Sequence, residues 1–248
     1  MSSSTVSVVI PCKDDARLLR VCLAALAEQT VLADEVIVVD NRSSDDSAAV
    51  AEAAGARVVR CEEPGIPAAS AAGYDAASGD LILRLDADCI PPVLWIEEMA
   101  AGFDEHPRAA ALTGPAQFYD GPAALRRPLV ACYLGAYVVV SSAALGHRPL
   151  FGSNMGIRRA AWREVRDGVH RSDQEIHDDM DLSFHIGAEH RVAYLRGASV
   201  MGMSMRPFYD GRAFMKRFSR GMRTVTIHWP EDFPPRRWTR LLRQGASR

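Results

Sequence analysis

Residues 76–92 read AASGDLILRLDADCIPP, and this stretch decides the fold class. Its centre, residues 81–85, is a short apolar run that follows Gly79 and has the length of a buried strand. The run ends in Asp86 and Asp88, and the two prolines that come next open a helix expected over residues 92–104. The stretch therefore predicts a buried strand whose carboxyl end carries acidic residues.

The same unit of strand and helix recurs through the first hundred residues. Three further apolar runs are expected as strands, at residues 6–10, 36–39 and 57–60, and they alternate with helical patterns at 15–28, 44–55 and 67–78. The second half is less regular, with strands expected at 109–118, 191–195 and 198–203 and helices at 123–145, 177–189 and 210–224. Alternating strands that are apolar on both faces predict an α/β fold, Rossmann-like, with a mainly parallel sheet and helices on both faces.

Charge is distributed unevenly along the chain. The 248 residues carry a net charge of −2, which excludes a chain that is basic throughout and binds nucleic acid by its charge. Residues 206–248 hold 11 Lys and Arg against 3 Asp and Glu, whereas residues 1–205 hold 18 against 28. We therefore expect an α/β domain over residues 1–205 and a basic, partly amphipathic helical segment over residues 206–248.

The cysteines and the N-terminus favour a cytoplasmic protein. Five cysteines are scattered without a CxxC pair, which is typical of a reducing compartment, and the first residues lack the pattern of a signal peptide. Residues 129–146 carry no charge over 18 positions, but Gly135 and four alanines keep their hydropathy modest. We expect a buried helix there rather than a membrane span.

Acidic side chains follow three of the predicted strands. Asp15 lies soon after the first, Asp40 ends the second, and Asp86 and Asp88 end the fourth. Ligands of open α/β sheets bind beyond these carboxyl ends, so we expect the aspartates to converge on one crevice. Gathered carboxylates repel one another unless they share a cation, and Mg²⁺ and Mn²⁺ prefer such oxygen ligands. Asp-x-Asp alone is weak evidence, because aspartates are also common turn residues.

Two later segments are further candidates for the site. Residues 177–182, HDDMDL, begin a predicted helix, and the helix dipole explains an acid at Asp178 more easily than it explains three aspartates and a histidine. A carboxylate aimed into the crevice could act as a general base toward a hydroxyl. Residues 151–159, FGSNMGIRR, place two glycines around an asparagine. This pattern indicates either a turn with close backbone approach to a ligand or an ordinary turn from strand to helix.

Five segments together resemble the inverting glycosyltransferases of family 2, which have the GT-A fold. They are SVVIPCKDD at 7–15, EVIVVDNRSSDDS at 35–47, AASGDLILRLDADCIPP at 76–92, FGSNMGIRRAAW at 151–162 and HDDMDLSFHI at 177–186. The segments follow the order of that family over residues 5–190. Their combination is far more specific than any one of them alone.

The resemblance implies a donor site and a metal site at the strand ends. Pro11, Asp15 and Asp40 would line the nucleoside pocket, with Asp40 accepting a hydrogen bond from the base. Asp86 would hold the ribose or the sugar side and contribute to the metal site. Asp88 would bind the divalent cation, Mn²⁺ or Mg²⁺.

The resemblance also implies an acceptor side and a catalytic base. Asn154 would lie beneath the donor sugar and the acceptor. Asp179 matches the catalytic base of the family, and Asp178 stands where glutamate is usual. His177 lies beside them and could orient Asp179 or meet the acceptor.

Two departures from the family pattern concern positive charge and metal binding. Residues 69–73 read ASAAG, where many members carry an arginine that approaches the donor. Residues 200–205 read VMGMSM, where many members carry a histidine that binds the metal, and methionine is a poor ligand for Mg²⁺ or Mn²⁺. Metal binding would then depend on Asp88, phosphates and water. Arg206 or Lys216 could supply part of the missing charge.

The implied function is transfer of a sugar from a UDP- or GDP-sugar to an acceptor hydroxyl, lipid-linked or small, with inversion. The alternative is a catalytically weak nucleotide-sugar-binding scaffold of the same fold, although Asp88 and Asp179 are retained. A nucleotidyltransferase is disfavoured, because residues 11–15 hold no glycine for a phosphate loop. Residues 206–248 allow two interpretations: a helix packed on the domain with a solvated basic rim, or a peripheral contact with the inner face of a membrane.

Overall fold

The computed structural model of the protein describes residues 4–197, 200–209 and 211–246. The first half contains β1 (Val6–Cys12), α1 (Ala16–Ala27), β2 (Glu35–Asp40), α2 (Ser47–Ala53), β3 (Arg57–Arg60), α3 (Ile66–Ala76), β4 (Leu81–Arg84) and α4 (Trp95–Glu105). The second half contains β5 (Ala109–Thr113), β6 (Ala116–Phe118), α5 (Ala123–Leu145), β7 (Met155–Arg158), α6 (Arg159–Val165), α7 (Asp178–Glu189), β8 (Arg191–Tyr194), β9 (Met201–Met203), the 3₁₀ turn η1 (Arg206–Phe208), α8 (Gly211–Ile227) and α9 (Pro234–Ala246). The predicted alternation of strand and helix is confirmed for the first half.

The central sheet has seven strands in the order β3-β2-β1-β4-β7-β5-β8. All neighbours are parallel except β7, which runs antiparallel to both β4 and β5. The turn predicted within residues 151–159 is present at 152–154, but the short strand β7 that follows it before α6 was not predicted. The single strand expected at 109–118 is also wrong, because Gly114 and Pro115 divide it into β5 and β6. The latter pairs with β9 in a separate two-stranded sheet.

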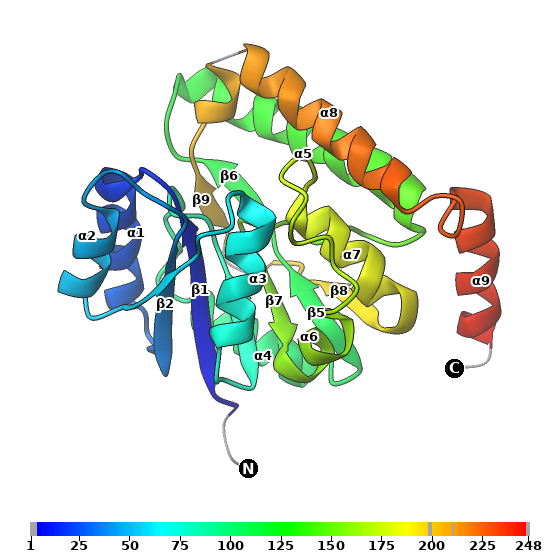
Figure 1. Ribbon diagram of the computed structural model, residues 1–248, viewed down its shortest axis with the longest axis horizontal. Helices are drawn as coiled ribbons and strands as arrows, with labels where there is room; N and C mark the ends of the chain where they lie inside the picture. The colour runs from blue at the N-terminus through cyan, green and yellow to red at the C-terminus, as the bar shows by residue number, and fades with distance from the viewer. Residues whose placement is uncertain (1–3, 198–199, 210, 247–248) are drawn as a thin grey trace.

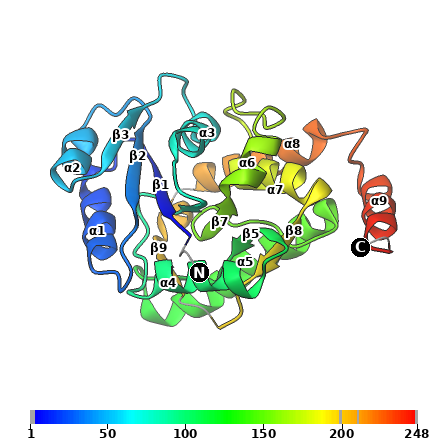
Figure 2. The same ribbon diagram turned by 90° about the horizontal axis from the view of Figure 1, so that it is seen from below.

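Helices cover both faces of the sheet, as predicted (Figure 2). One core contains buried residues of α1 and α4, such as Leu19 and Trp95, against one side of the strands. The other core contains residues of α3 and α6, such as Tyr74 and Trp162, against the opposite side. Gly73 allows α3 to approach the sheet closely, since a Cβ there would meet the Val9 side chain. The strand residues are apolar on both faces because both faces are covered.

Helix α5 is not the buried helix that its apolar sequence predicts. Among its described residues only Ser141, Ala144 and Leu145 are buried, whereas Val139 is 70% exposed. One side of the helix packs on the body, and among the described residues nothing covers its other, apolar side. The sequence pattern could not show which side is covered, because both sides are apolar. By length and composition, α5 alone among the described helices would be able to cross a membrane.

The C-terminal helices are fastened to the body by a buried arginine. Arg237 of α9 is fully buried, and its guanidinium donates to the backbone carbonyls of Leu145 at 2.6 Å and Phe184 at 3.0 Å. The indole of Trp238 donates to the Ala143 carbonyl at 2.9 Å. In Figure 1 both α5 and α8 run along the upper edge, beyond the carboxyl ends of the parallel strands. The C-terminal segment therefore packs on the domain near the end of the sheet where ligands bind.

The Glu35 carboxylate joins the amino ends of neighbouring strands. It accepts hydrogen bonds from the Ser7 hydroxyl at 2.6 Å and from the N–H and hydroxyl of Ser78 at 2.6 and 2.7 Å, and it pairs with Arg57 at 2.9 Å. Burial would raise the pKa of Glu35, but these hydrogen bonds outweigh it and lower the pKa to about 2. The ionised carboxylate thus stabilises the folded state.

We expect Glu35→Gln to lower the free energy of unfolding by about 1–3 kcal/mol at pH 7, because it removes charge-assisted hydrogen bonds. A carboxyl with a lowered folded-state pKa contributes fully above its unfolded value near 4.5, and the contribution is lost as pH falls toward 2. Urea unfolding of wild type, Glu35→Gln and the exposed control Glu52→Gln at pH 7 and pH 3 checks this. The prediction would be contradicted if Glu35→Gln lowered the free energy of unfolding by the same amount at pH 3 as at pH 7.

Candidate active site

The loops that follow β1 and β2 hold each other by hydrogen bonds. The N–H and hydroxyl of Ser44 both donate to Asp14 Oδ1, at 2.7 and 2.9 Å, and the Ala16 N–H donates to Asp45 Oδ2 at 2.9 Å. Asp14 and Arg42 lie in the left-handed backbone region, with φ of 53° and 63°. Such conformations cost energy in residues other than glycine and persist where the surroundings enforce them. The two loops therefore form one rigid unit.

This unit carries three of the predicted donor-site residues. Pro11 is buried in β1 opposite Val39 of β2. Asp15 precedes α1 directly, and Asp40 ends β2, where its Oδ1 accepts the Ser43 N–H at 3.0 Å. Because β1 and β2 are parallel neighbours, all three residues lie at the same edge of the sheet, as the sequence predicts.

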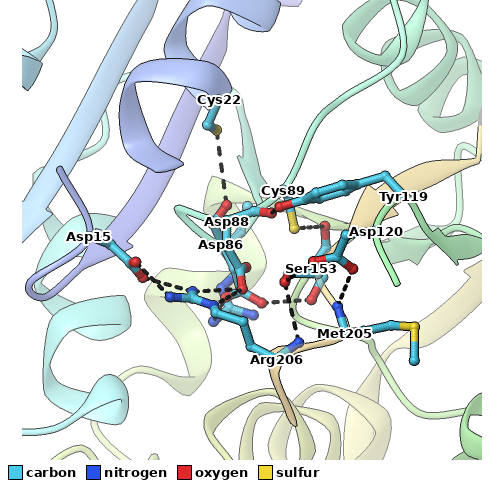
Figure 3. A network of polar contacts seen from close by, with 12 residues as sticks. Asp15, Cys22, Asp86, Asp88, Cys89, Tyr119, Asp120, Ser153, Met205 and Arg206 are labelled. Atoms are coloured by element: carbon cyan, nitrogen blue, oxygen red, sulfur yellow. Dashed lines mark hydrogen bonds and ion pairs between the residues drawn. The ribbon is translucent and has the colours of Figure 1, made fainter. Parts of the chain in front are cut away.

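Asp86 and Asp88 follow β4 at the same edge (Figure 3). Asp86 accepts the Ser153 hydroxyl at 2.6 Å through Oδ2 and pairs with Arg84 at 2.9 Å through Oδ1. Burial and the neighbouring Asp86 carboxylate raise the pKa of Asp88, although Arg206 opposes that shift. The two carboxylates of the Asp-x-Asp pair therefore repel each other in the absence of a further cation.

Arg206 supplies positive charge at the position where the sequence lacks a histidine. Its guanidinium donates to both oxygens of Asp15, at 2.6 and 2.8 Å, and to Asp88 Oδ2 at 2.7 Å (Figure 3). Hydrogen bonding to Asp15 and the charge of Asp88 raise the pKa of Arg206. Lys216, the other candidate cation, instead pairs with the exposed Glu175 at 3.3 Å. Arg206 therefore links the β1 loop to the Asp-x-Asp pair.

Arg84 is the functional candidate that sequence reasoning missed. Its side chain is 3% exposed and lies 2.9 Å from Asp86 and 3.3 Å from Asp178. Burial alone would lower the pKa of Arg84, but the Asp178 and Asp86 carboxylates raise it. Ser70 of α3, within the ASAAG stretch, donates to Asp178 Oδ2 at 2.7 Å. The available signal was an arginine inside the apolar run LILRL, since a buried charge needs a partner.

Consecutive residues of one loop contact the Asp-x-Asp pair and the predicted base. The Gly152 N–H donates to Asp179 Oδ2 at 2.8 Å, and the next residue, Ser153, donates to Asp86. Burial and the neighbouring Asp178 raise the pKa of Asp179, while the Gly152 N–H opposes the shift. A Cβ at position 152 would overlap the Arg84 guanidinium, so a larger residue there would displace Arg84 from its carboxylates. The structure therefore brings Asp86, Asp178 and Asp179 to one place.

Asn154 and His177 are engaged by the protein itself. Asn154 is buried, its Oδ1 accepts the Trp95 indole N–H at 2.8 Å, and its Nδ2 donates to the Pro115 carbonyl at 2.8 Å. The amide thus supports the loop that precedes β7. His177 Nε2 donates to the Arg217 carbonyl of α8 at 2.8 Å, which turns the ring toward the C-terminal segment.

The residues present fit a hard divalent cation. Oxygen atoms of Asp86 and Asp88 and the sulfur of Cys89 lie within 4.8 Å of one another. The two carboxylates are suitable ligands for Mg²⁺ or Mn²⁺, whereas burial raises the pKa of the Cys89 thiol and keeps it a poor one. Around the site, five carboxylates face two guanidinium groups: Asp15, Asp86, Asp88, Asp178 and Asp179 against Arg84 and Arg206. This excess of negative charge favours a cation.

Curated relatives resemble the chain over part of its length. A glycosyltransferase of Mycobacterium tuberculosis, described as uncharacterized, is 39% identical over 88 residues, 36% of this chain and 38% of the relative. The glycosyltransferase AglE of Haloferax volcanii is 34% identical over 100 residues, 37% of this chain and 33% of the relative. The undecaprenyl-phosphate 4-deoxy-4-formamido-L-arabinose transferase of Sodalis glossinidius is 40% identical over 103 residues, 37% and 31% of the two chains. The matches thus span about a third of the relatives.

Solved structures show the same fold. TarS of S. aureus, in complex with UDP, has a TM-score of 0.64 at 18% identity and is matched over 90% of this chain and 64% of its own. Glucosyl-3-phosphoglycerate synthase of Mycobacterium tuberculosis, in complex with Mn²⁺, UDP and phosphoglyceric acid, has a TM-score of 0.57 at 22% identity over 83% and 72% of the two chains. These likenesses confirm the expected GT-A fold.

The family assignment follows from the sequence itself. The five segments that resemble the family occur in order, and the structure brings the aspartates from four of them to one edge of the sheet. The model of glycosyl transferase family 2 matches residues 7–166, well over half of the chain. The chain belongs to glycosyl transferase family 2.

Proposed function

We propose that the protein transfers a sugar from a nucleoside-diphosphate sugar, linked to UDP or GDP, to an acceptor hydroxyl with inversion. The observation that carries the proposal is the loop at 152–153, which hydrogen-bonds Asp179 with one residue and Asp86 with the next. A group that can take a proton therefore lies beside the carboxylates that suit a diphosphate and its cation. This arrangement suits a displacement at an anomeric carbon, because it offers a base for the attacking hydroxyl and a site for the leaving diphosphate.

On the donor side, residues at the ends of β1, β2 and β4 hold the nucleotide. Asp40 accepts a hydrogen bond from an N–H of the base, and Pro11 and Asp15 line the nucleoside pocket. Asp86 and Asp88 would hold the divalent cation, which when bound would offset the charge on the leaving diphosphate. Arg206, which already contacts Asp15 and Asp88, contributes a further positive charge at the phosphates.

On the acceptor side, Asp179 removes the proton of the hydroxyl that attacks the sugar. Its raised pKa, caused by burial beside Asp178, makes its ionised form a stronger base than an ordinary aspartate. Arg84 holds Asp178 in place by an ion pair, and His177 holds the start of α7 against α8. Asn154 positions the loop that orients Asp179. The single displacement inverts the configuration at the sugar.

We also propose that the C-terminal segment binds the surface of an anionic membrane, where a lipid-linked acceptor would be found. Met215, Phe218 and Met222 follow helical spacing on α8 and are 61%, 59% and 48% exposed. Arg206 and Arg237 are engaged by the body of the protein, but Arg217, Arg236 and Arg243 are exposed on α8 and α9 and complement anionic lipid headgroups. The exposed apolar side of α5 is a further apolar surface that a membrane could cover.

We expect Asp179→Asn to reduce kcat by about 10²–10⁴-fold with donor affinity nearly unchanged, because it removes only the base. In the wild type, kcat should rise with pH through a pKa above the ordinary carboxyl value, since the ionised form is active and burial raises that pKa. Release of the nucleoside diphosphate measures the rate, and the exposed Asp167→Asn is the matched control. Turnover of the variant near the wild-type level would exclude Asp179 as the base.

Calorimetric titration with UDP, GDP, TDP and CDP, with and without Mn²⁺, tests the donor site. We expect one nucleotide to bind with Mn²⁺ dependence and Asp88→Asn to lose that dependence. Arg206→Gln should weaken binding without Mn²⁺ and make the dependence steeper, because it frees Asp88 from its cation. The matched control is Lys216→Gln, which removes a cation outside the site. Nucleotide binding without turnover of any donor would support the catalytically weak scaffold. Absence of binding by all four nucleotides would overturn the donor site, and unchanged Mn²⁺ dependence in Asp88→Asn would overturn the metal assignment.

Co-sedimentation with vesicles tests the membrane proposal. We expect the wild type to bind vesicles of phosphatidylcholine with phosphatidylglycerol but not phosphatidylcholine alone, and high salt to weaken binding. Replacing Met215, Phe218 and Met222 by serine should reduce binding at least about tenfold, since burial of each side chain contributes about 1.5–3 kcal/mol. Leu32→Ser, at an exposed apolar residue of the α1–β2 loop, is the control. Equal vesicle binding by the triple serine variant and Leu32→Ser would contradict the membrane proposal.

A further inference from the structure

A second cluster of metal-ligating side chains lies outside the candidate active site. His170 follows α6, Asp181 and His185 are one turn apart on α7, and His228 follows α8. One ligand atom from each of the four residues lies within 4.8 Å of the others. Three segments that are distant in the sequence therefore bring three imidazoles and one carboxylate together.

The centre of the cluster is the buried Asp181 carboxylate. Its side chain is 3% exposed, and that of His228 is 5% exposed. Asp181 Oδ1 lies 2.7 Å from His170 Nδ1, 3.3 Å from His228 Nε2 and 3.6 Å from His185 Nε2. All three rings therefore turn a nitrogen atom toward one oxygen.

Hydrogen bonds around the cluster orient two of its members. The His170 N–H donates to Asp181 Oδ2 at 2.9 Å, which leaves Oδ1 directed toward the rings. His228 Nδ1 lies 2.7 Å from the Thr224 carbonyl, and because a carbonyl only accepts, this nitrogen carries the proton. The Nε2 atom of neutral His228 then presents a lone pair to the cluster. A histidine whose second nitrogen donates to a carbonyl is typical of metal ligands.

The remaining nitrogen atoms lack the partners that burial requires. His185 Nε2 and His228 Nε2 are buried, and neither has a hydrogen-bond partner among the described residues. A lone pair that faces a carboxylate oxygen is unfavourable, so the contact needs either a proton on each ring or one shared metal ion. A single metal ion would satisfy both nitrogens and the carboxylate together. Three imidazoles and one carboxylate suit four-coordinate Zn²⁺, whereas Mg²⁺ and Mn²⁺ prefer oxygen ligands.

We propose that His170, Asp181, His185 and His228 form a structural Zn²⁺ site. All four positions are protein ligands, as in closed structural sites rather than catalytic ones. The site joins the α6–α7 loop and α7 to the chain that leaves α8, so it fastens the C-terminal helices to the domain. It shares no ligand with the Asp86 and Asp88 pair, and its existence does not depend on the proposed transfer reaction.

Zinc binding to the tag-free, full-length protein tests the site directly. After removal of metal by a chelator, we expect titration to show one tightly bound Zn²⁺ per chain. His185→Ala and His228→Ala should weaken binding by more than about 100-fold, since even residues that only support metal ligands affect affinity by about 10–100-fold. His106→Ala, at an exposed histidine, and Asp88→Asn, at the other metal site, should keep it. Tight Zn²⁺ binding by His228→Ala, or loss of Zn²⁺ binding in Asp88→Asn, would overturn the proposal.

Two measurements on the wild type do not depend on how the variants fold. Co²⁺ in place of Zn²⁺ should give the strong visible absorption of a four-coordinate centre, and a weak six-coordinate spectrum would contradict the site. Limited proteolysis should cut the chain between α7 and α9 more slowly with Zn²⁺ than without it, because the bound ion holds the C-terminal helices in place. Equal cleavage with and without Zn²⁺ would overturn the fastening role.

Discussion

The buried guanidinium of Arg84 is the constraint on which the carboxylate arrangement depends. Burying an unpaired charge costs several kcal/mol, and Arg84 avoids this cost only because Asp86 and Asp178 lie beside it. The same group favours glycine at position 152, because a Cβ there would displace the guanidinium from its present position. The end of β4, the loop before β7 and the start of α7 must therefore meet at this point.

The parts of the fold that follow from local patterns were predictable. Strands β1 to β4 are short apolar runs separated by helical stripes, and their parallel arrangement follows from that alternation. Strand β7 was not predictable, because four residues with a glycine among them carry little signal and take their conformation from β4 and β5 on either side. The exposure of α5 was equally hidden, since a helix that is apolar all round gives no indication of which side is covered.

In the site, the sequence indicated the acids and offered Arg206 or Lys216 as a cation, but it showed neither which of the two is used nor the role of Arg84. Strand ends in a parallel sheet share one edge, so the meeting of Asp15, Asp86 and Asp88 follows from topology. Arg206 pairs with Asp15 across 191 positions of sequence, and no periodicity reveals such a contact. Arg84 lies within an apolar run that still reads as a strand, so the sequence pattern did not single it out. The partners of buried charges thus become visible only once tertiary contacts are known.

Helix α7 connects the candidate active site to the histidine cluster. Asp178, Asp181 and His185 are spaced three and four residues apart, so they form one stripe along the helix. The first turn of this stripe pairs with Arg84, and the later turns meet His170 and the chain after α8. A shift of one residue would rotate the stripe by about 100° and break both sets of contacts. The direction in which Asp179 points therefore depends on the contact of Asp178 with Arg84 and on the contacts of Asp181 with the histidine cluster.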